Sequence, residues 1–214
     1  MNAKGLTGED NYTVGSDHGD RRTRAIRLLL DRRANTIEHL NGFLLDHLER
    51  TEGLLTSWGC SEEVSTAGLC HAFYGTDGFD TALLGLEHRD LLVTAVGKSV
   101  EELVYLYASC DRRFLYPQLG SDGTNCFRDR CTGDTFPLSG EQLRDFVDLT
   151  LANESDVGIV GRSSEGIPAW LTVMYRQFRH LASPSVSEGC QRLVASGKQP
   201  NAGFRISLID DNDQ

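Results

Sequence analysis

The sequence predicts an all-α fold in which several helices pack around one core. Apolar residues recur at helical spacing along most of the chain, as they do between Phe43 and Trp58. Residues that begin and end helices separate these segments, and a strand pair is indicated only near residues 204–209. The 214 residues, 39% of them hydrophobic, are enough for one core and leave little room for a second full domain.

Charge and hydropathy exclude several classes of protein. The net charge of −10 at pH 7 repels phosphate backbones, so we expect no binding to nucleic acid or to an anionic membrane surface. No apolar run approaches the roughly 20 residues that a membrane-spanning helix needs, and residues 1–5 lack a hydrophobic signal core. We therefore expect a cytoplasmic protein whose partner is a small-molecule substrate.

The six cysteines follow no regular framework along the chain. In a chain without a secretion signal we expect them to be reduced thiols rather than disulfides. Cys126 and Cys131 are close in sequence, but no second pair and no nearby histidine completes a zinc site with them. We interpret them as loop cysteines.

The N-terminal elements are predicted from composition and periodicity. Residues 1–20 hold almost nothing apolar and are expected to form a mobile arm. Residues 21–33 place leucines among arginines, which is typical of a short amphipathic helix. An Asn-Gly turn at residues 41–42 leads to a helix over residues 43–58, and Gly59 ends that helix.

Two histidines are predicted to meet where this helix packs against the next one. His47 lies beside the apolar stripe of the first helix. Ser61 caps the second helix, which runs to His71. The small residues Ala67 and Gly68 let the first helix approach closely. His47 and His71 are therefore expected to converge from adjacent antiparallel helices.

A carboxylate, Asp111, is predicted to join the same interior. Residues 81–96 are expected to be helical, wholly or in part. Ser99 and Glu102 have the spacing of a capping box, and the helix that they begin is predicted to reach Asp111. Helical spacing then places Asp111 on the apolar side of that helix. A carboxylate there needs a partner, which Arg112 or a metal ion would provide.

The C-terminal half adds helices without a recognisable motif. Residues 116–137 are expected to form a loop, because proline and glycine recur in them. A capping box from Ser139 opens a helix that residues 155–166 are predicted to break, and Pro168 suits the first turn of a further helix to residue 181. The predicted organisation is a mobile arm over residues 1–20, a single helical domain over residues 21–205 and an acidic tail over residues 206–214.

His47, His71 and Asp111 together would form a metal site. Histidine and carboxylate ligands from facing helices are how helical bundles hold metal ions. A set of two histidines and one aspartate suits zinc, manganese or iron.

The same residues carry a resemblance to a known superfamily. The layout is similar to the HD superfamily of metal-dependent phosphohydrolases, including the hydrolase domain of the alarmone enzymes. It more closely resembles a poorly characterised HD-like family with a composite motif that is far more specific than any one part of it. The matching residues are His39, His47-Leu48-Glu49-Arg50-Thr51, Trp58-Gly59, Ala67 to Thr76, and Asp111-Arg112.

The resemblance implies an HD-like helical bundle, with extra C-terminal helices, that holds one divalent ion and hydrolyses a phosphoester. His47, His71 and Asp111 would be the metal ligands. The other roles that it implies are a fourth ligand or general base for His39, substrate orientation for Tyr74 and Thr76, and recognition of an anionic group for Arg112.

One position departs from the HD pattern and keeps alternatives open. Ala72 follows His71, where HD hydrolases have a metal-binding aspartate. One alternative is an HD-type iron oxygenase, and another is a metal-free site in which the histidines and Asp111 act as acid and base. A third is a degenerate HD-like domain that binds a small molecule or a partner without catalysis, and the plainest is a structural cluster of core histidines bonded to Asp111.

Overall fold

The computed structural model describes residues 17–120, 126–160 and 167–196, and within them it confirms the all-α prediction. The helices are α1 (Asp17–Asp31), α2 (Leu44–Ser57), α3 (Glu62–Cys70), α4 (Arg89–Val96), α5 (Lys98–Ser109), α6 (Arg112–Leu115), α7 (Gly140–Val160), α8 (Ala169–Phe178) and α9 (Pro184–Ser196). Three short 3-10 helices accompany them, η1 (Ala34–Thr36), η2 (Leu86–His88) and η3 (Tyr116–Gln118).

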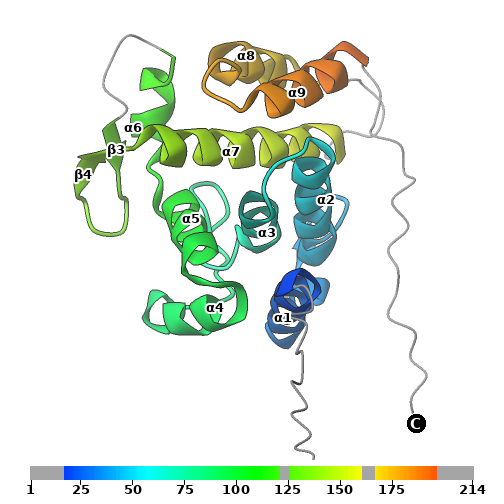
Figure 1. Ribbon diagram of the computed structural model, residues 1–214, viewed down its shortest axis with the longest axis vertical. Helices are drawn as coiled ribbons and strands as arrows, with labels where there is room; N and C mark the ends of the chain where they lie inside the picture. The colour runs from blue at the N-terminus through cyan, green and yellow to red at the C-terminus, as the bar shows by residue number, and fades with distance from the viewer. Residues whose placement is uncertain (1–16, 121–125, 161–166, 197–214) are drawn as a thin grey trace, which may run out of the picture.

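Helix α7 is the centre of the architecture. It crosses the whole domain, with α8 and α9 on one side and α2, α3 and α5 on the other (Figure 1). Helices α1 and α4 lie beyond α2, α3 and α5, farthest from α7 (Figure 1). The inner faces of α2, α3, α5 and α7 therefore enclose the core, and polar side chains on those faces are brought together.

The pairing of α2 with α3 follows the sequence prediction. Gly59 adopts a positive φ of 79° after α2, and the Ser61 hydroxyl accepts a hydrogen bond from Val64 N at the start of α3. A Cβ atom on Gly68 would lie 2.4 Å from Leu55 Cδ1, so the absence of a side chain lets the two helices touch. This contact sets the distance between His47 and His71.

The predicted course of α5 is wrong at both ends. The helix begins at Lys98 after Gly97, so the Ser99 capping box does not form. It ends at Ser109, and Cys110 is extended. Asp111 N donates to Arg128 O at 3.1 Å, and the Asp111 carboxylate caps α6 through Phe114 N. Helical periodicity therefore does not apply to Asp111.

Helix α7 is longer than predicted. Ser139 and Gln142 form the expected capping box, with each side chain accepting from the other residue's backbone N–H. The helix then continues through residues 155–160, where a break was predicted. Gly158, which lies inside the predicted break, faces α8, where an added Cβ would lie 3.1 Å from Leu171 Cδ2. The absence of a side chain at Gly158 therefore lets α7 and α8 pack closely.

Two small hairpins were not predicted. Strands β1 (Glu38–His39) and β2 (Gly42–Phe43) pair across the predicted Asn-Gly turn, and β3 (Cys126–Arg128) pairs antiparallel with β4 (Thr135–Pro137) inside the predicted loop. The strand pair expected near residues 204–209 and the tail over residues 206–214 lie outside the described residues. Residues 1–16 of the predicted arm also lie outside the described residues. Helix α1 begins at Asp17, within the range that was predicted to be an arm.

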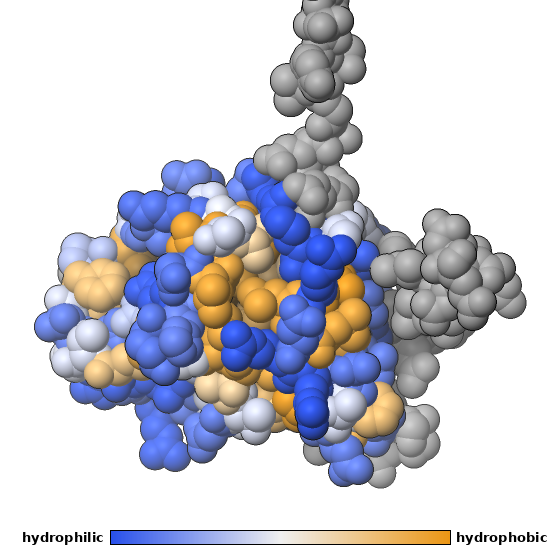
Figure 2. All heavy atoms as spheres, turned by 90° about the horizontal axis from the view of Figure 1, so that it is seen from below, coloured by the Kyte–Doolittle hydropathy of each residue, from blue (hydrophilic) through white to orange (hydrophobic). Residues whose placement is uncertain are grey.

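The face formed by α1 and α4 is partly apolar. Apolar side chains gather in the middle of this face, between hydrophilic ones (Figure 2). Leu30 of α1 and Leu91 of α4 are 41% and 39% exposed. Among the helices in the described ranges, none is long and apolar enough to cross a membrane.

Candidate functional site

The centre of the site is a pair of buried histidines. His47 comes from the first turn of α2, and His71 is the C-cap residue of α3. Their side chains are 2% and 3% exposed. The two Nε2 atoms are 3.3 Å apart. His47 and His71 therefore converge from neighbouring helices, as predicted.

Two further residues of the centre come from α7 and were not predicted. Asn153 Oδ1 lies 3.0 Å from His47 Nε2, and Asp156 Oδ2 lies 2.6 Å from His47 Nδ1. Arg50 donates to both oxygens of Asp156, at 2.7 Å and 3.1 Å. The signal that would have found them is the periodicity of Leu149, Asn153 and Asp156, which keeps one face of α7 inside the protein beyond the predicted break.

The hydrogen bonds determine where the protons lie on the two histidines. His71 Nδ1 is 2.7 Å from Gly68 O, and a carbonyl oxygen only accepts, so this nitrogen carries the proton. His47 Nδ1 faces the carboxylate of Asp156 and donates to it in the same way. Each imidazole therefore has its lone pair on Nε2 when it is neutral.

Asn153 adds a third acceptor at the same point. Its Nδ2 donates to Glu154 Oε1 at 3.1 Å, so its Oδ1 is the atom that faces His47 Nε2. Two ring nitrogens and an amide oxygen converge here, so a proton on His47 Nε2 would be shared with His71 Nε2 and Asn153 Oδ1. Such an arrangement is suited to a positively charged species, either a proton or a metal ion.

Burial keeps His71 unprotonated, and hydrogen bonds keep Asp156 ionised beside His47. Burial, helped by His47, lowers the pKa of His71 to about 3. Burial works against the ionised form of Asp156, but hydrogen bonds from His47 and Arg50 hold its pKa below the usual range. At neutral pH His71 is therefore a neutral ligand or base, and Asp156 is an anion that orients His47.

His39 covers the centre from the β1–β2 hairpin. Its ring centroid is 4.7 Å from that of His47 and 4.8 Å from that of Phe79. Burial and the neighbouring His47 lower the pKa of His39 to about 4. The structure thus brings all three predicted histidines together.

Asp111 is not brought to the histidines. Its Oδ1 accepts from Phe114 N at 3.0 Å, and its Oδ2 accepts from Arg128 at 2.9 Å and 2.6 Å. The predicted place of Asp111 beside His71 is taken by Tyr107 of α5, whose ring centroid is 5.4 Å from that of His71. The reason is the end of α5 at Ser109, which turns the chain away before Asp111.

Tyr74 and Thr76 support the site rather than line it. The Tyr74 hydroxyl donates to Glu101 Oε1 at 2.9 Å, and Arg89 holds both oxygens of the same carboxylate. Thr76 exchanges backbone hydrogen bonds with Phe79, the residue that packs on His39. The loop after His71 therefore holds Phe79 against the ring of His39.

Arg112 points into the protein beside the histidine centre. Its Nη1 atom donates to Glu154 Oε1 at 3.2 Å. Its Cζ atom lies 5.2 Å from the ring centroid of Tyr107 and 5.9 Å from that of Tyr116. Through Glu154, Arg112 is connected to Asn153 and so to His47.

The donor set for a metal ion differs from the predicted one, because the neutral amide of Asn153 is present in place of the Asp111 carboxylate. Within residues 17–120, 126–160 and 167–196, no group of three or more His, Cys, Asp or Glu side chains is placed to hold a metal ion. The arrangement at His47 and His71 consists of two imidazole nitrogens and the amide oxygen of Asn153. All six cysteines are free thiols.

A family model matches the part of the chain that contains some of these site residues. Residues 28–112 match the model of a family described as Domain of unknown function (DUF6817). No curated protein and no solved structure matches the chain. The matched segment includes the three histidines and Arg112, whereas Asn153 and Asp156 lie beyond it.

Proposed function

We propose that the protein is a metal-dependent hydrolase of a small phosphoester, with one divalent ion, zinc, manganese or iron, held by His47 and His71. The observation that carries the proposal is the pair of Nε2 atoms that face each other at 3.3 Å while both Nδ1 atoms donate hydrogen bonds. Metal-binding histidines are oriented in this way, with the second ring nitrogen held by a carboxylate or a carbonyl.

The separation of the two nitrogens fits a shared metal ion. Histidine nitrogens lie 2.0 to 2.1 Å from zinc, so two of them in a tetrahedral site are about 3.3 to 3.4 Å apart. The Nε2 atoms of His47 and His71 have this spacing without rearrangement. Asn153 Oδ1 is the third donor, and substrate or water would complete the coordination.

The reaction follows from the resemblance to HD hydrolases and from the charges around the site. When bound, a divalent ion lowers the pKa of a water ligand toward neutrality and so supplies a hydroxide nucleophile. His39, which is unprotonated at neutral pH and lies beside His47, would be the general base. Arg112 supplies positive charge for the anionic group of the ester.

Ala72 predicts a low affinity for the metal ion. It is 2% exposed and brings no donor to the position of the HD aspartate. Asn153 provides a neutral oxygen where a carboxylate would provide a negative charge. We therefore expect the metal to bind more weakly than at a site with two histidines and two aspartates, and to be lost on dialysis against a chelator.

A second candidate uses the same lone pairs with a proton in place of the metal. The 2.6 Å hydrogen bond between His47 and Asp156 favours this reading, because a carboxylate behind a histidine stabilises its protonated form. The site would then be a metal-free acid and base pair, with His47 as acid and His71 as base.

The test is metal content and metal affinity. Protein purified without an affinity tag would be analysed for metals, stripped with a chelator, and titrated with Mn²⁺, Zn²⁺ and Fe²⁺ by calorimetry. We expect one equivalent to bind, and His71→Asn to abolish binding while Asp111→Asn leaves it unchanged. Chromogenic phosphomonoesters and phosphodiesters would then be assayed with the reloaded protein.

The outcomes separate the readings. No metal binding by the wild-type protein would reject the metal-dependent hydrolase, and ester hydrolysis without metal would then favour the acid and base pair. Iron with oxygen consumption would favour an oxygenase. Equal metal binding by wild type and His71→Asn would show that the ion is held elsewhere.

A further inference from the structure

Three buried hydrogen-bonding groups near His71 have no partner at standard hydrogen-bond geometry, although the Tyr107 hydroxyl and the Arg112 guanidinium lie close to each other. They are the hydroxyl groups of Tyr107 and Tyr116 and the Nε atom of Arg112, all buried within the described part of the chain. Buried donors without acceptors are costly and uncommon in folded proteins. One guanidinium N–H group and two hydroxyl groups near it call for a ligand that accepts hydrogen bonds.

The three donors come from different elements that meet at one place. Tyr107 belongs to α5, Arg112 begins α6, and Tyr116 begins η3. The guanidinium of Arg112 lies near both tyrosine rings, and the ring of Tyr107 contacts that of His71. The donors are therefore connected to His71 through the ring of Tyr107.

We infer that Arg112, Tyr107 and Tyr116 bind the phosphoryl group of the substrate. A phosphoryl group carries three non-bridging oxygens, so it can accept from donors that arrive from three directions, which a planar carboxylate does less well. This inference rests on the proposed function and assigns the substrate-binding half of the same site, including two tyrosines that the sequence analysis did not single out.

The tyrosine hydroxyls are in the form that donates. Burial raises the pKa of both Tyr107 and Tyr116, and the charge of Arg112 works against that rise. Both groups are therefore protonated at neutral pH. Neither can serve as a base, which is consistent with a binding role and leaves proton transfer to His39.

The charges around Arg112 predict that metal and phosphoryl group bind together. Arg112 is already paired with Glu154, at 3.2 Å between Nη1 and Oε1. An added anion would leave this interior with an excess of negative charge, which is unfavourable in a buried environment. A divalent ion on His47 and His71 would offset it, so phosphate affinity should depend on the metal.

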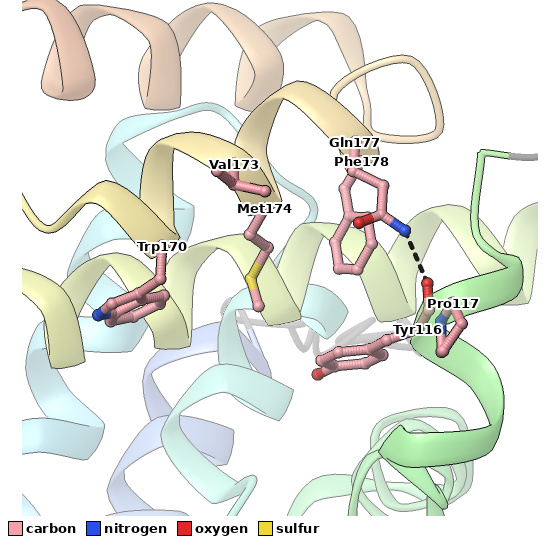
Figure 3. A pocket seen from close by; sticks show the side chains of 7 residues that line it. All are labelled: Tyr116, Pro117, Trp170, Val173, Met174, Gln177 and Phe178. Atoms are coloured by element: carbon pink, nitrogen blue, oxygen red, sulfur yellow. Dashed lines mark hydrogen bonds between the residues drawn. The ribbon is translucent and has the colours of Figure 1, made fainter.

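Tyr116 also borders a groove that is open to solvent. It forms part of an open groove of about 490 Å³ between η3 and α8, together with Met174 and Trp170 (Figure 3). The ring of Tyr116 extends from η3 into the space below α8 (Figure 3). Its hydroxyl is buried, and its ring centroid is 5.9 Å from Arg112 Cζ, so one ring contacts both the groove and the guanidinium cluster.

The experiment measures the binding of inorganic phosphate to the Mn²⁺-loaded protein by calorimetry. Tyr107→Phe and Tyr116→Phe each remove one donor and keep the ring. Tyr175→Phe is the matched control, because Tyr175 on α8 also has a buried hydroxyl without a partner. We expect at least a tenfold loss of phosphate affinity in the first two variants, less than twofold in the control, and at least a tenfold loss in wild-type protein without metal.

The same titrations distinguish failure of this inference from failure of the proposed function. If Mn²⁺ binds but phosphate does not, or if phosphate binds equally to all four proteins, the phosphoryl site is refuted and the metal site stands. If Mn²⁺ does not bind but phosphate affinity still depends on both tyrosines, the phosphoryl site stands and the metal-dependent function is refuted. Thermal unfolding checks the fold, since loss of an unpaired hydroxyl should not lower the melting temperature.

Discussion

Replacing His71 should reduce the loss of stability that the protein suffers in mild acid. The ring of His71 is 3% exposed, and its pKa is about 3, against 6.5 for the unperturbed side chain. Below pH 6.5 the His71 ring therefore binds a proton in the unfolded chain but not in the folded chain. The contribution of His71 is fully present above pH 6.5 and is lost progressively as the pH falls toward 3.

The magnitude follows from the linkage relation. Each pH unit between the two pKa values is worth about 1.4 kcal/mol. Between pH 6.5 and pH 5 the His71 ring should therefore cost about 2 kcal/mol of unfolding free energy. His39, whose pKa is about 4, acts in the same direction, but it is present in wild type and variant and largely cancels in the comparison.

The assay is urea unfolding followed by circular dichroism, at pH 7 and pH 5, on chelator-treated protein. His71→Asn is the informative variant, because the asparagine amide can still donate to Gly68 O. The drop in unfolding free energy between the two pH values should be about 2 kcal/mol smaller in His71→Asn than in wild type. The exposed His88→Asn is the control and should show the wild-type drop. Equal drops in all three proteins would refute the assignment of a buried neutral His71.

Two further predictions concern helix contact and metal orientation. Gly68→Ala should lower the unfolding free energy by about 1 to 3 kcal/mol in urea titrations, because its Cβ would meet Leu55 Cδ1 at 2.4 Å. Gly53→Ala, whose Cβ would meet nothing within 4 Å, should instead be stabilising by about 0.5 to 1 kcal/mol, and equal effects would argue against the close contact. Asp156→Asn should weaken Mn²⁺ binding by about 10- to 100-fold, since it removes the carboxylate that orients His47, while Asp111→Asn should have no effect in the same calorimetric titration.

Part of the site could be predicted because its causes are local. A helix that ends at Gly59, a cap at Ser61 and a small residue at Gly68 all act within a few residues of one another. They are sufficient to turn the chain back on itself and to press α3 against α2. The meeting of His47 and His71 follows from that geometry.

The other part could not be predicted because it depends on competing interactions. The apolar spacing of α5 permits a helix as far as Asp111, but the pairing of Asp111 N with Arg128 O and the capping of α6 end it sooner. Likewise the composition of residues 155–166 signals a break, whereas in the protein Gly158 gives α8 room to pack. In both places tertiary contacts outweighed local preference.

By itself, the sequence determined that the chain is helical, where most helices begin, and that His47 and His71 converge, because caps, turns and periodicity act over a few residues. The place of His39 beside them was implied only by the resemblance. Only the tertiary structure decided which groups hold those histidines. Asp156 lies 109 residues after His47, and its position depends on which face of α7 packs over α2. That choice is made by the whole core at once, so no local pattern contains it.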